Sequence, residues 1–535
     1  MSVRVVRWLI ALLVVGLLSS SLLPVTGTRG AANVAVTLIV EATTVPGENV
    51  FVVGSTAELG SWNTANAVPL ATGAGVYPRW SATISLPAGA AVEYKYIKKN
   101  GATVTFEPLG PNRAFSAPAS GGVTRVEAWG SPATAAPGLS GKRALWLDRG
   151  SLAWSGVPGA TYRLLSDPDG AIDLAGATFL PLAAAGSVSA AAYPKSPNAS
   201  GLPRLALSPA DLAHVPGLLK GEVVIASYNS GGALIDATRA QLQGVLDDVY
   251  AASARPITLG VSHAAGAPTL RVWAPTARNV TLRRYADSTT AAFASHPMAF
   301  DPTSGVWSVT GTAGWDKQFY LYDVEVYVPD LDAVVNNLVT DPYSVSLSRN
   351  SLRSQIVDLA GDASLKPAGW DSLAKPALAA PEDISVYEVH VRDFSATDGS
   401  VPAAQRGTFK AFTSLASAGM QHLLALKNAG LTHVHLLPAF DIASVNEDPA
   451  ARTDPDPALL ATYARDSDQQ QAAVAATRAS DSFNWGYDPL HYGAPEGSYS
   501  TSPDGAARIL EFREMVATLN QNGLRVVMDV VYNHT

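Results

Sequence analysis

The spacing of apolar residues changes near residue 384 of this 535-residue chain, and the change limits the folds that the chain can adopt. Upstream, short runs in which every second residue is apolar alternate with Gly, Pro and Asn turns, a pattern typical of antiparallel β-sheets. Downstream, strand patterns alternate with helix patterns, which indicates a parallel sheet or a barrel. A chain of this length is expected to form several domains. We therefore expect β-sheet domains first and an α/β domain last.

The predicted elements of the α/β part are strands at 384–394, 431–438 and 524–531 and helices at 416–430 and 504–523. Each helix ends at a Gly, as helices often do. The last strand is almost wholly apolar apart from Asp529, so we predict that it is buried on both faces. Asn533 and His534 follow where this strand ends, and α/β barrels place substrate-contacting residues there. The same three polar residues would also suit a structural role, fixing a loop by hydrogen bonds.

Composition and the N-terminus restrict the partners and the location of the protein. The net charge is −8 and no basic cluster follows the first few residues, which argues against nucleic acid or an anionic membrane and favours a neutral substrate. Arg4 and Arg7 precede an uncharged apolar run at 8–23, the layout of a secretory signal peptide. Because this run is shorter than the roughly 20 residues that span a bilayer, we predict a secreted protein with a signal peptide at 1–32 rather than a membrane anchor. No sequence feature indicates an oligomeric state.

Residues 33–129 have the pattern of a small antiparallel sandwich or barrel, with strands predicted at 34–41, 49–53, 81–86 and 91–98. Trp62 lies in a predicted turn, Ala57-Glu-Leu-Gly-Ser-Trp62, which is an unusual place for a core Trp. An exposed indole is suited to stacking on the apolar face of a sugar ring.

The same stretch resembles the family 20 starch-binding module. The matching motifs are Gly47-Glu-Asn-Val-Phe-Val-Val-Gly54, Glu58-Leu-Gly-Ser-Trp62, Glu93-Tyr-Lys-Tyr-Ile97 and Pro111-Asn-Arg113. The resemblance implies one starch-binding site built from Trp62, Lys95, Phe106 and Asn112. The family usually has Trp where this chain has Phe106, which offers a smaller stacking surface.

Two further β-rich domains are predicted between this module and residue 380. Residues 130–140 have the composition of a linker. Residues 141–260 form a β-rich module in which Trp146 and Trp154 are expected to be core residues rather than ligand platforms. Residues 261–380, a predicted sandwich and connector, contain Arg271-Val-Trp-Ala-Pro-Thr-Ala277 and Thr340-Asp-Pro-Tyr343. These motifs resemble the family 48 β-sandwich that precedes the catalytic barrel in glycogen-branching and debranching enzymes.

Residues 442–482 are a long polar insertion, which returns through Phe483-Asn-Trp-Gly-Tyr-Asp-Pro489. Aromatic rings stack on pyranoses and carboxylates bind hydroxyls, so this loop has the composition of a sugar site. A loop held in place by its own aromatics is the alternative. Together with Tyr387-Glu-Val-His-Val-Arg-Asp-Phe394 and Asp529-Val-Val-Tyr-Asn-His534, the loop resembles debranching enzymes of glycoside hydrolase family 13, of the pullulanase and limit dextrinase type.

This resemblance implies a retaining hydrolase of α-1,6 bonds in starch, pullulan or limit dextrin. It casts Tyr487 as the ring under the cleaved sugar, His534 as a ligand of its hydroxyls, Asp488 and Asn533 as neighbours, and Asp529 as a support of the site. The catalytic carboxylates come from later barrel strands, so we expect no catalytic residue in this chain. The expected fold is thus three β-sandwich-type domains followed by an incomplete (β/α)8 barrel at 381–535.

Two other functions remain compatible with the sequence: a starch-binding protein without hydrolytic activity, and another family 13 enzyme acting on α-glucans. No cofactor is required for any of these functions. Calcium is possible, because Asn533 matches a position that ligates calcium in some α-amylases.

Overall fold

The computed structural model describes residues 33–72, 78–118, 123–130, 139, 142–155, 161–170, 172–174, 176–229, 232 and 234–532. The predicted signal peptide, most of the predicted linker, Asn533 and His534 lie outside the described residues. The chain divides into two compact units, Met1–Pro137 and Gly138–Thr535.

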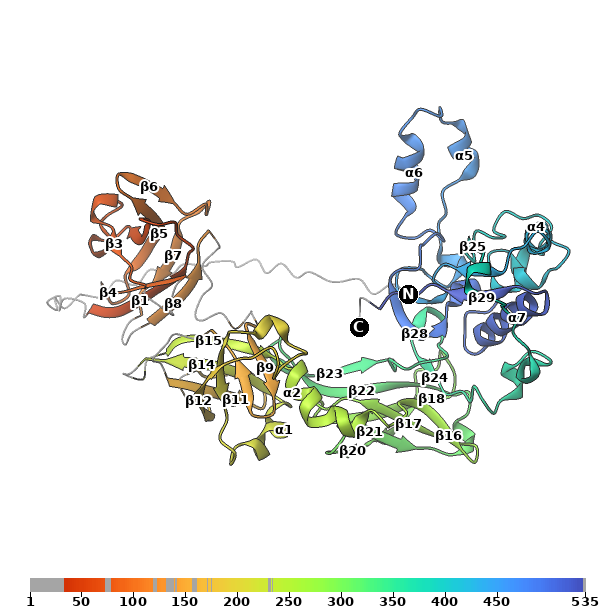
Figure 1. Ribbon diagram of the computed structural model, residues 1–535, viewed down its shortest axis with the longest axis horizontal. Helices are drawn as coiled ribbons and strands as arrows, with labels where there is room; N and C mark the ends of the chain where they lie inside the picture. The colour runs from red at the N-terminus through yellow and green to blue at the C-terminus, as the bar shows by residue number, and fades with distance from the viewer. Residues whose placement is uncertain are drawn as a thin grey trace, which may run out of the picture. The chain divides into compact units, whose positions relative to one another are not determined.

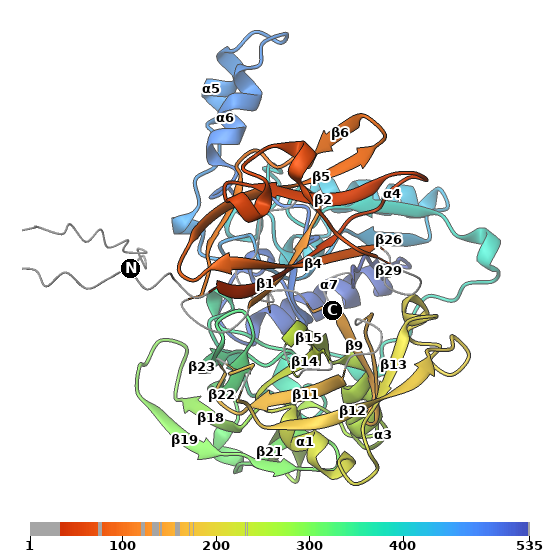
Figure 2. The ribbon, with the colours of Figure 1, turned by 90° about the vertical axis from the view of Figure 1, so that its left-hand side faces the viewer.

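The first unit is a sandwich of two sheets, shown as two layers in Figure 2. One sheet has the order β4-β1-β8, with β4 at Arg79–Pro87, β1 at Asn33–Glu41 and β8 at Val123–Ala128. The other has the order β3-β2-β5-β6, with β7 also paired to β5; these are Val68–Pro69, Asn49–Gly54, Ala91–Asn100, Thr103–Phe106 and Arg113–Ser116. All four predicted strands are confirmed. Alternate residues from both sheets fill the core, among them Val36, Leu38, Val52, Tyr94 and Tyr96.

The second unit begins with a closed barrel of strand order β10-β13-β12-β11-β14-β15-β9 (Figure 1). In chain order, β9 to β15 are Ala144–Asp148, Ser151–Ala153, Thr161–Asp167, Phe179–Ser187, Pro203–Ala206, Glu222–Tyr228 and Leu234–Gln241. The expectation of a sandwich is wrong here, because β15 pairs in parallel with β9 and closes the sheet. Trp146 and Trp154 are buried in the barrel core, as predicted.

Short helices accompany this barrel. They are α1 (Val215–Leu218), α2 (Gln243–Leu246), a π-helical turn η5 (Asp247–Ala251) and α3 (Ala252–Ala254).

A β-sandwich follows, as expected, with the sheets β16-β17-β21-β20 and β19-β18-β22-β23, and with β24 also paired to β22. In chain order, β16 to β24 are Gly260–Ala264, Ala267–Trp273, Asn279–Tyr285, Phe293–Pro297, Ala299–Asp301, Val306–Thr310, Phe319–Val328, Ala333–Val339 and Ser354–Gln355. Its core contains Leu270, Leu282, Trp307 and Tyr320.

The last part contains the parallel strands β25 (Val386–Val389), β26 (His433–Leu436) and β29 (Arg525–Met528), in that spatial order. The predicted helices are confirmed as α4 (Ala418–Asn428) and α7 (Ala507–Gln521). The prediction that the last strand is buried on both faces is wrong, since Val527 and Met528 are each 40% exposed. Among the described strands, β29 pairs only with β26, and it is β26 that lies between two neighbours.

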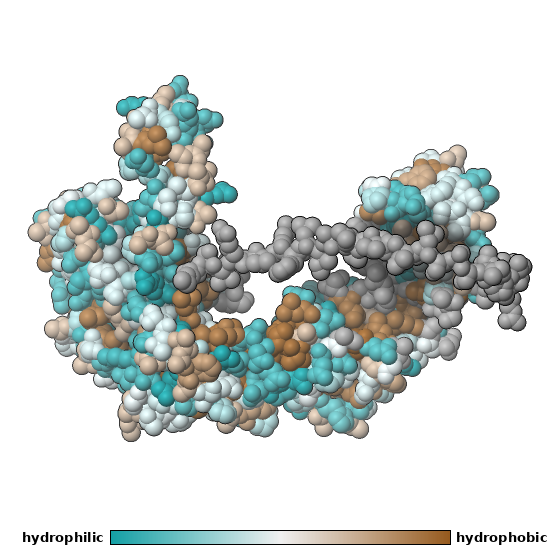
Figure 3. Space-filling view, turned by 180° about the vertical axis from the view of Figure 1, so that it is seen from behind, coloured by the Kyte–Doolittle hydropathy of each residue, from teal (hydrophilic) through white to brown (hydrophobic). Residues whose placement is uncertain are grey.

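The insertion after β26 contains two helices, α5 (Pro457–Thr462) and α6 (Gln469–Thr477), which project side by side in Figures 1 and 2. Figure 3 shows them mostly in hydrophilic and intermediate colours. The antiparallel pair β27 (Phe440–Ile442) and β28 (Pro489–Pro495) closes the base of the insertion. No helix in the described ranges is long and apolar enough to cross a membrane.

Candidate carbohydrate-binding sites

Trp62 is held outward by a tight turn in the first unit. The 3-10 turn Ala57–Leu59 is followed by three residues in the left-handed region, with φ of 78° at Gly60, 46° at Ser61 and 62° at Trp62. The backbone N–H of Trp62 donates to the carbonyl of Gly54 at 2.7 Å, which ties the turn to the end of β2. The Trp62 side chain is 37% exposed, so part of its indole is available for stacking.

The other three predicted starch-binding residues lie around β5. Lys95 pairs with Val53 of β2, next to the Gly54 that binds the Trp62 backbone. Its ammonium donates to the carbonyl of Leu109 at 2.6 Å. Phe106 stands opposite Ile97 and is 45% exposed, so it faces the same side of the sheet as Lys95.

Asn112 completes this group through Glu93, whose carboxylate accepts a hydrogen bond from the Asn112 amide at 3.0 Å. Sequence reasoning missed Glu93, although it precedes Lys95 by two residues and a strand places such pairs on one face. The first unit thus exposes the Trp62 ring in the turn after β2 and the Phe106 ring on the Lys95 side of the sheet, while the Asn112 amide is bonded to Glu93.

A buried ion pair fixes the loop that carries Phe106 and Asn112. The guanidinium of Arg113 donates to Glu107 at 2.6 Å, and both side chains are fully buried. Phe106 directly precedes Glu107, and Asn112 directly precedes Arg113. Glu107 also accepts the backbone N–H of Tyr96 at 3.0 Å. The two ends of the loop are therefore anchored in the core, and the exposed side chains need little ordering when a ligand binds.

A second buried carboxylate, Glu127, joins the same network. It accepts hydrogen bonds from the hydroxyls of Tyr94 at 2.5 Å and Tyr96 at 2.7 Å. Burial and the neighbouring Glu127 charge raise the pKa of Tyr94 and of Tyr96 well above the usual value, so both hydroxyls remain donors.

In the α/β part, the structure brings Tyr487 and Asp529 together. The Tyr487 hydroxyl donates to the Asp529 carboxylate at 2.6 Å, and this bond raises the pKa of Tyr487 to about 12. Asp529 itself is placed by its N–H, which donates to the carbonyl of Leu436 in β26 at 3.0 Å. Asp488 accepts the Ala443 N–H at 2.9 Å through its backbone carbonyl. Tyr487 remains 40% exposed, so its ring can still contact a ligand.

The loop around Tyr487 has features of both predicted alternatives, a sugar site and a loop held in place by its own aromatic residues. Phe483 and Trp485 are 43% and 61% exposed, whereas Asn484 between them is buried. The Asn484 carbonyl lies 2.7 Å from Nε2 of His390, whose imidazole also stacks on Phe483 at 5.9 Å between ring centroids. The loop is therefore pinned by its inward residues while it presents aromatic rings outward.

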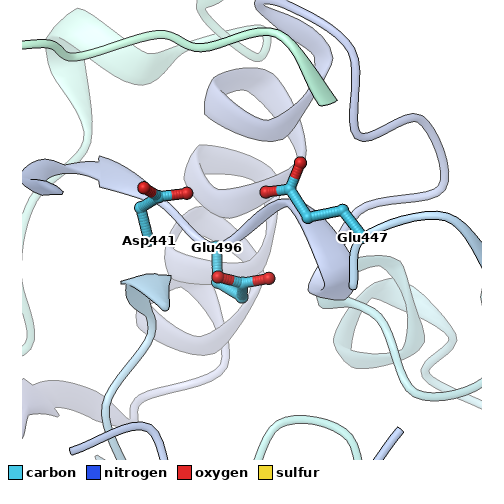
Figure 4. Close-up of side chains that lie close together, drawn as sticks. All are labelled: Asp441, Glu447 and Glu496. Carbon is cyan, nitrogen blue, oxygen red and sulfur yellow. The ribbon is translucent and has the colours of Figure 1, made fainter. Parts of the chain in front are cut away.

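Three buried carboxylates that the sequence analysis did not single out meet in the α/β part of the chain. Asp441, Glu447 and Glu496 place ligand oxygens within 4.8 Å of one another, and Figure 4 shows them around one space. Asp441 lies in β27, Glu447 near the start of the insertion, and Glu496 directly after β28. Desolvation, strengthened by the other two carboxylates, raises the pKa of Glu496 to about 8. Desolvation also raises the pKa of Glu447.

These residues fit a salt-bridge cluster better than a calcium site. The fully buried guanidinium of Arg508 lies 3.0 Å from Glu447 and 3.5 Å from Asp441, where it already supplies positive charge. His491 approaches the other side of Asp441 at 2.7 Å. Calcium prefers six to eight oxygen ligands at about 2.3–2.6 Å, whereas Arg508 and His491 already pair with these carboxylates.

Comparisons with known proteins assign the β-rich part to three domain families. Residues 33–127 match the starch binding domain, residues 141–248 match the pullulanase N2 domain, and residues 248–344 match carbohydrate-binding module 48, the isoamylase N-terminal domain. Relatives that match over several of these domains include pullulanases. The chain is 42% identical over 362 residues to a pullulanase of Klebsiella pneumoniae, a match that covers 61% of this chain and 33% of the relative.

Over the compared residues, this chain is similar to pullulanases. Pullulanase 1 of Arabidopsis thaliana is 41% identical over 331 residues, which again cover 61% of this chain and 33% of the relative. A solved Klebsiella pneumoniae pullulanase complexed with maltotriose has a TM-score of 0.70 at 31% identity, covering 95% of this chain and 53% of that one. The apo pullulanase from the same organism has a TM-score of 0.68 at 38% identity, covering 74% and 47%. The chain thus spans about a third of the length of these curated pullulanases and about half the length of the solved ones.

Proposed function

We propose that this chain serves the hydrolysis of α-1,6 bonds in starch, pullulan or limit dextrin, and that its described residues bind the glucan rather than cleave it. The observation that carries the proposal lies in the first unit, where Trp62 and Phe106 expose their rings and Phe106 shares one side of the sheet with Lys95. Rings flanked by hydrogen-bonding groups suit the alternating apolar and hydroxyl surfaces of a sugar chain. The pullulanase relatives support the choice of branched α-glucan.

Retaining cleavage needs two accessible carboxyl groups about 5 Å apart across the glycosidic bond. Asp441, Glu447 and Glu496 are close to one another, but all three are buried and two of them, Asp441 and Glu447, pair with Arg508. Asp529 is bound to Tyr487 in a supporting position. We therefore assign Tyr487, Asp488, Asn533 and His534 to binding of the glucan and Asp529 to support of Tyr487. The two-carboxylate mechanism itself requires no cofactor.

Starch binding is tested with Trp62→Ala. We expect this change to cost about 1–3 kcal/mol of binding free energy to starch or β-cyclodextrin, the scale of losing a large stacked side chain. Val45→Ala, which truncates a 61% exposed apolar residue of the same unit, is the matched control and should leave affinity unaltered. Equal migration of Trp62→Ala and the unsubstituted chain in a starch affinity gel would refute the assignment.

Hydrolysis is tested by incubating the 535-residue chain with pullulan and measuring reducing ends. We expect none to form. Turnover that Asp529→Asn abolishes would contradict the roles proposed here, because Asp529 would then take part in the chemistry.

Export is a further part of the proposal. Residues 1–32 have the layout of a signal peptide, and we expect the secreted chain to begin near Asn33. N-terminal sequencing of secreted material is the measurement, and an intact Met1 in a membrane fraction would favour an anchor.

A further inference from the structure

An open cavity of about 510 Å³ lies in the second unit between the end of β9, residues 192–196 and the helical turns 244–255. This volume is within the range typical of small-ligand sites. Gly244 lets α2 form one wall, because a Cβ at that position would lie 2.4 Å from the carbonyl oxygen of Trp146. The π-helical turn Asp247–Ala251 lines the cavity beside α2, and such turns occur frequently at functional sites.

The aromatic side chain in this cavity is held in a fixed position. The hydroxyl of Tyr193 donates to Asp148 at 2.9 Å, while its ring packs against the small apolar cluster that contains Leu147 and Val188. Asp148 also accepts the N–H of Gly150 at 2.8 Å. Since each carboxylate oxygen has two lone pairs, Asp148 can accept further hydroxyl donors from a ligand.

The rim of the cavity offers both donors and acceptors. The ammonium of Lys195 pairs with Asp247, and both side chains are largely exposed, so water or a ligand can reach them. Asp248 accepts the N–H of Arg149 at 2.9 Å, and Arg255 adds a guanidinium to the lining. An aromatic ring surrounded by hydrogen-bond donors and acceptors is suited to binding a polyhydroxylated ligand.

Two other ligand classes fit less well. Asp148, Asp247 and Asp248 outnumber the two cationic side chains of the lining, which disfavours an anion. In the described part of the chain, acidic and histidine side chains gather three ligand atoms within 4.8 Å only at Asp441, Glu447 and Glu496, so this cavity does not have the geometry of a metal site.

The geometry points to a second carbohydrate site in the pullulanase N2 domain, in which Tyr193 and the carboxylates of Asp148 and Asp247 bind a short α-glucan segment. The ligand class rests on the proposed function, whereas the position of the site does not. Such a site lies in the same unit as Tyr487 and would bind glucan independently of Trp62.

The test uses the full chain with Trp62→Ala and Tyr487→Ala as the background, which removes the two sites already described. Isothermal titration with maltotriose is expected to show remaining binding in this background. Adding Tyr193→Ala should weaken it at least tenfold, and adding Asp247→Asn should weaken it several-fold. Asp169→Asn, an exposed carboxylate of the same barrel outside the cavity, is the control and should have no effect.

Tyr193→Phe keeps the packed ring and loses only the bond to Asp148, so it separates binding from folding. Tyr193→Phe should weaken maltotriose binding less than Tyr193→Ala does. The thermal unfolding of both variants is measured alongside, to show whether either substitution destabilises the fold. Absence of binding in the background, or equal binding with and without the cavity substitutions, would overturn the proposal. Either result leaves the starch-gel test of Trp62 unaffected, so the two proposals fail separately.

Discussion

Replacing Arg508 with methionine removes the positive charge from the buried carboxylate cluster and keeps most of the side-chain volume. The guanidinium lies 3.0 Å from Glu447 and 3.5 Å from Asp441, and all three side chains are almost fully buried. Breaking a buried ion pair by removing one partner typically costs about 3–5 kcal/mol, because the other charge is left uncompensated. We expect a value near the lower end, about 3 kcal/mol, because His491 and the Gly497 N–H still contact the carboxylates.

Two further variants calibrate this value. Arg508→Met combined with Glu447→Gln should recover at least about 1 kcal/mol relative to the single change, because one uncompensated charge is removed as well. Arg513→Met, five residues from Arg508 along the same helix, is the matched control. Arg513 donates to the carbonyls of Leu365 and Leu359, so its loss should cost only about 1 kcal/mol.

Hydrogen exchange followed by mass spectrometry is the appropriate assay, because a chain of several domains does not unfold in one step. The opening free energy of α7 and of the segment around Asn350, whose N–H donates to Glu447, reports on the cluster directly. An Arg508→Met variant that opens no more readily than Arg513→Met would refute the reasoning. So would a chelator that destabilises the unsubstituted chain as much as the substitution does, because a bound cation would then hold the cluster.

Three other changes give predictions of different kinds. Burial raises the pKa of Glu496 from 4.5 to about 8 in the folded chain. The stability of the cluster should therefore fall as pH rises through this window, by up to about 1.4 kcal/mol per pH unit. Glu496→Gln should flatten this slope in the opening free energy of α7, measured by hydrogen exchange at pH 5.5 and 7.5. Glu107→Gln weakens the bond to Arg113 that anchors the starch-binding loop, so β-cyclodextrin affinity should drop several-fold in titration calorimetry. Tyr487→Phe removes the bond to Asp529 and should lower the local opening free energy of the 483–488 loop by about 1 kcal/mol, measured by hydrogen exchange.

Elements that depend on local patterns were predictable from the sequence. The strands β1, β2, β4 and β5 follow from alternation of apolar residues, because one face of each meets a core. The helices α4 and α7 end just before Gly430 and Gly523, which adopt φ of 113° and 82° that other residues rarely adopt. Trp62 was identified as exposed from its place in a turn, and its positive φ is a property of that turn.

The exposure of β29 was not predictable in the same way. An apolar run indicates that a strand is suited to burial, but its burial depends on which elements pack on each side. In the described structure β29 has β26 on one side, and Val527 and Met528 remain partly exposed.

Contacts between distant residues were decided by the tertiary structure alone. The barrel closes because Ala240 pairs with Ala144 in parallel. This pairing cannot be predicted from the spacing of apolar residues along either strand. Arg508 is 67 residues from Asp441, and Tyr487 is 42 residues from Asp529. The amino-acid sequence by itself determined the strand patterns, the helix ends and the turn that exposes Trp62, because these depend on neighbours along the chain. Only the folded topology determined which charges meet in the core, because the free energy of a buried charge depends on partners brought together by packing.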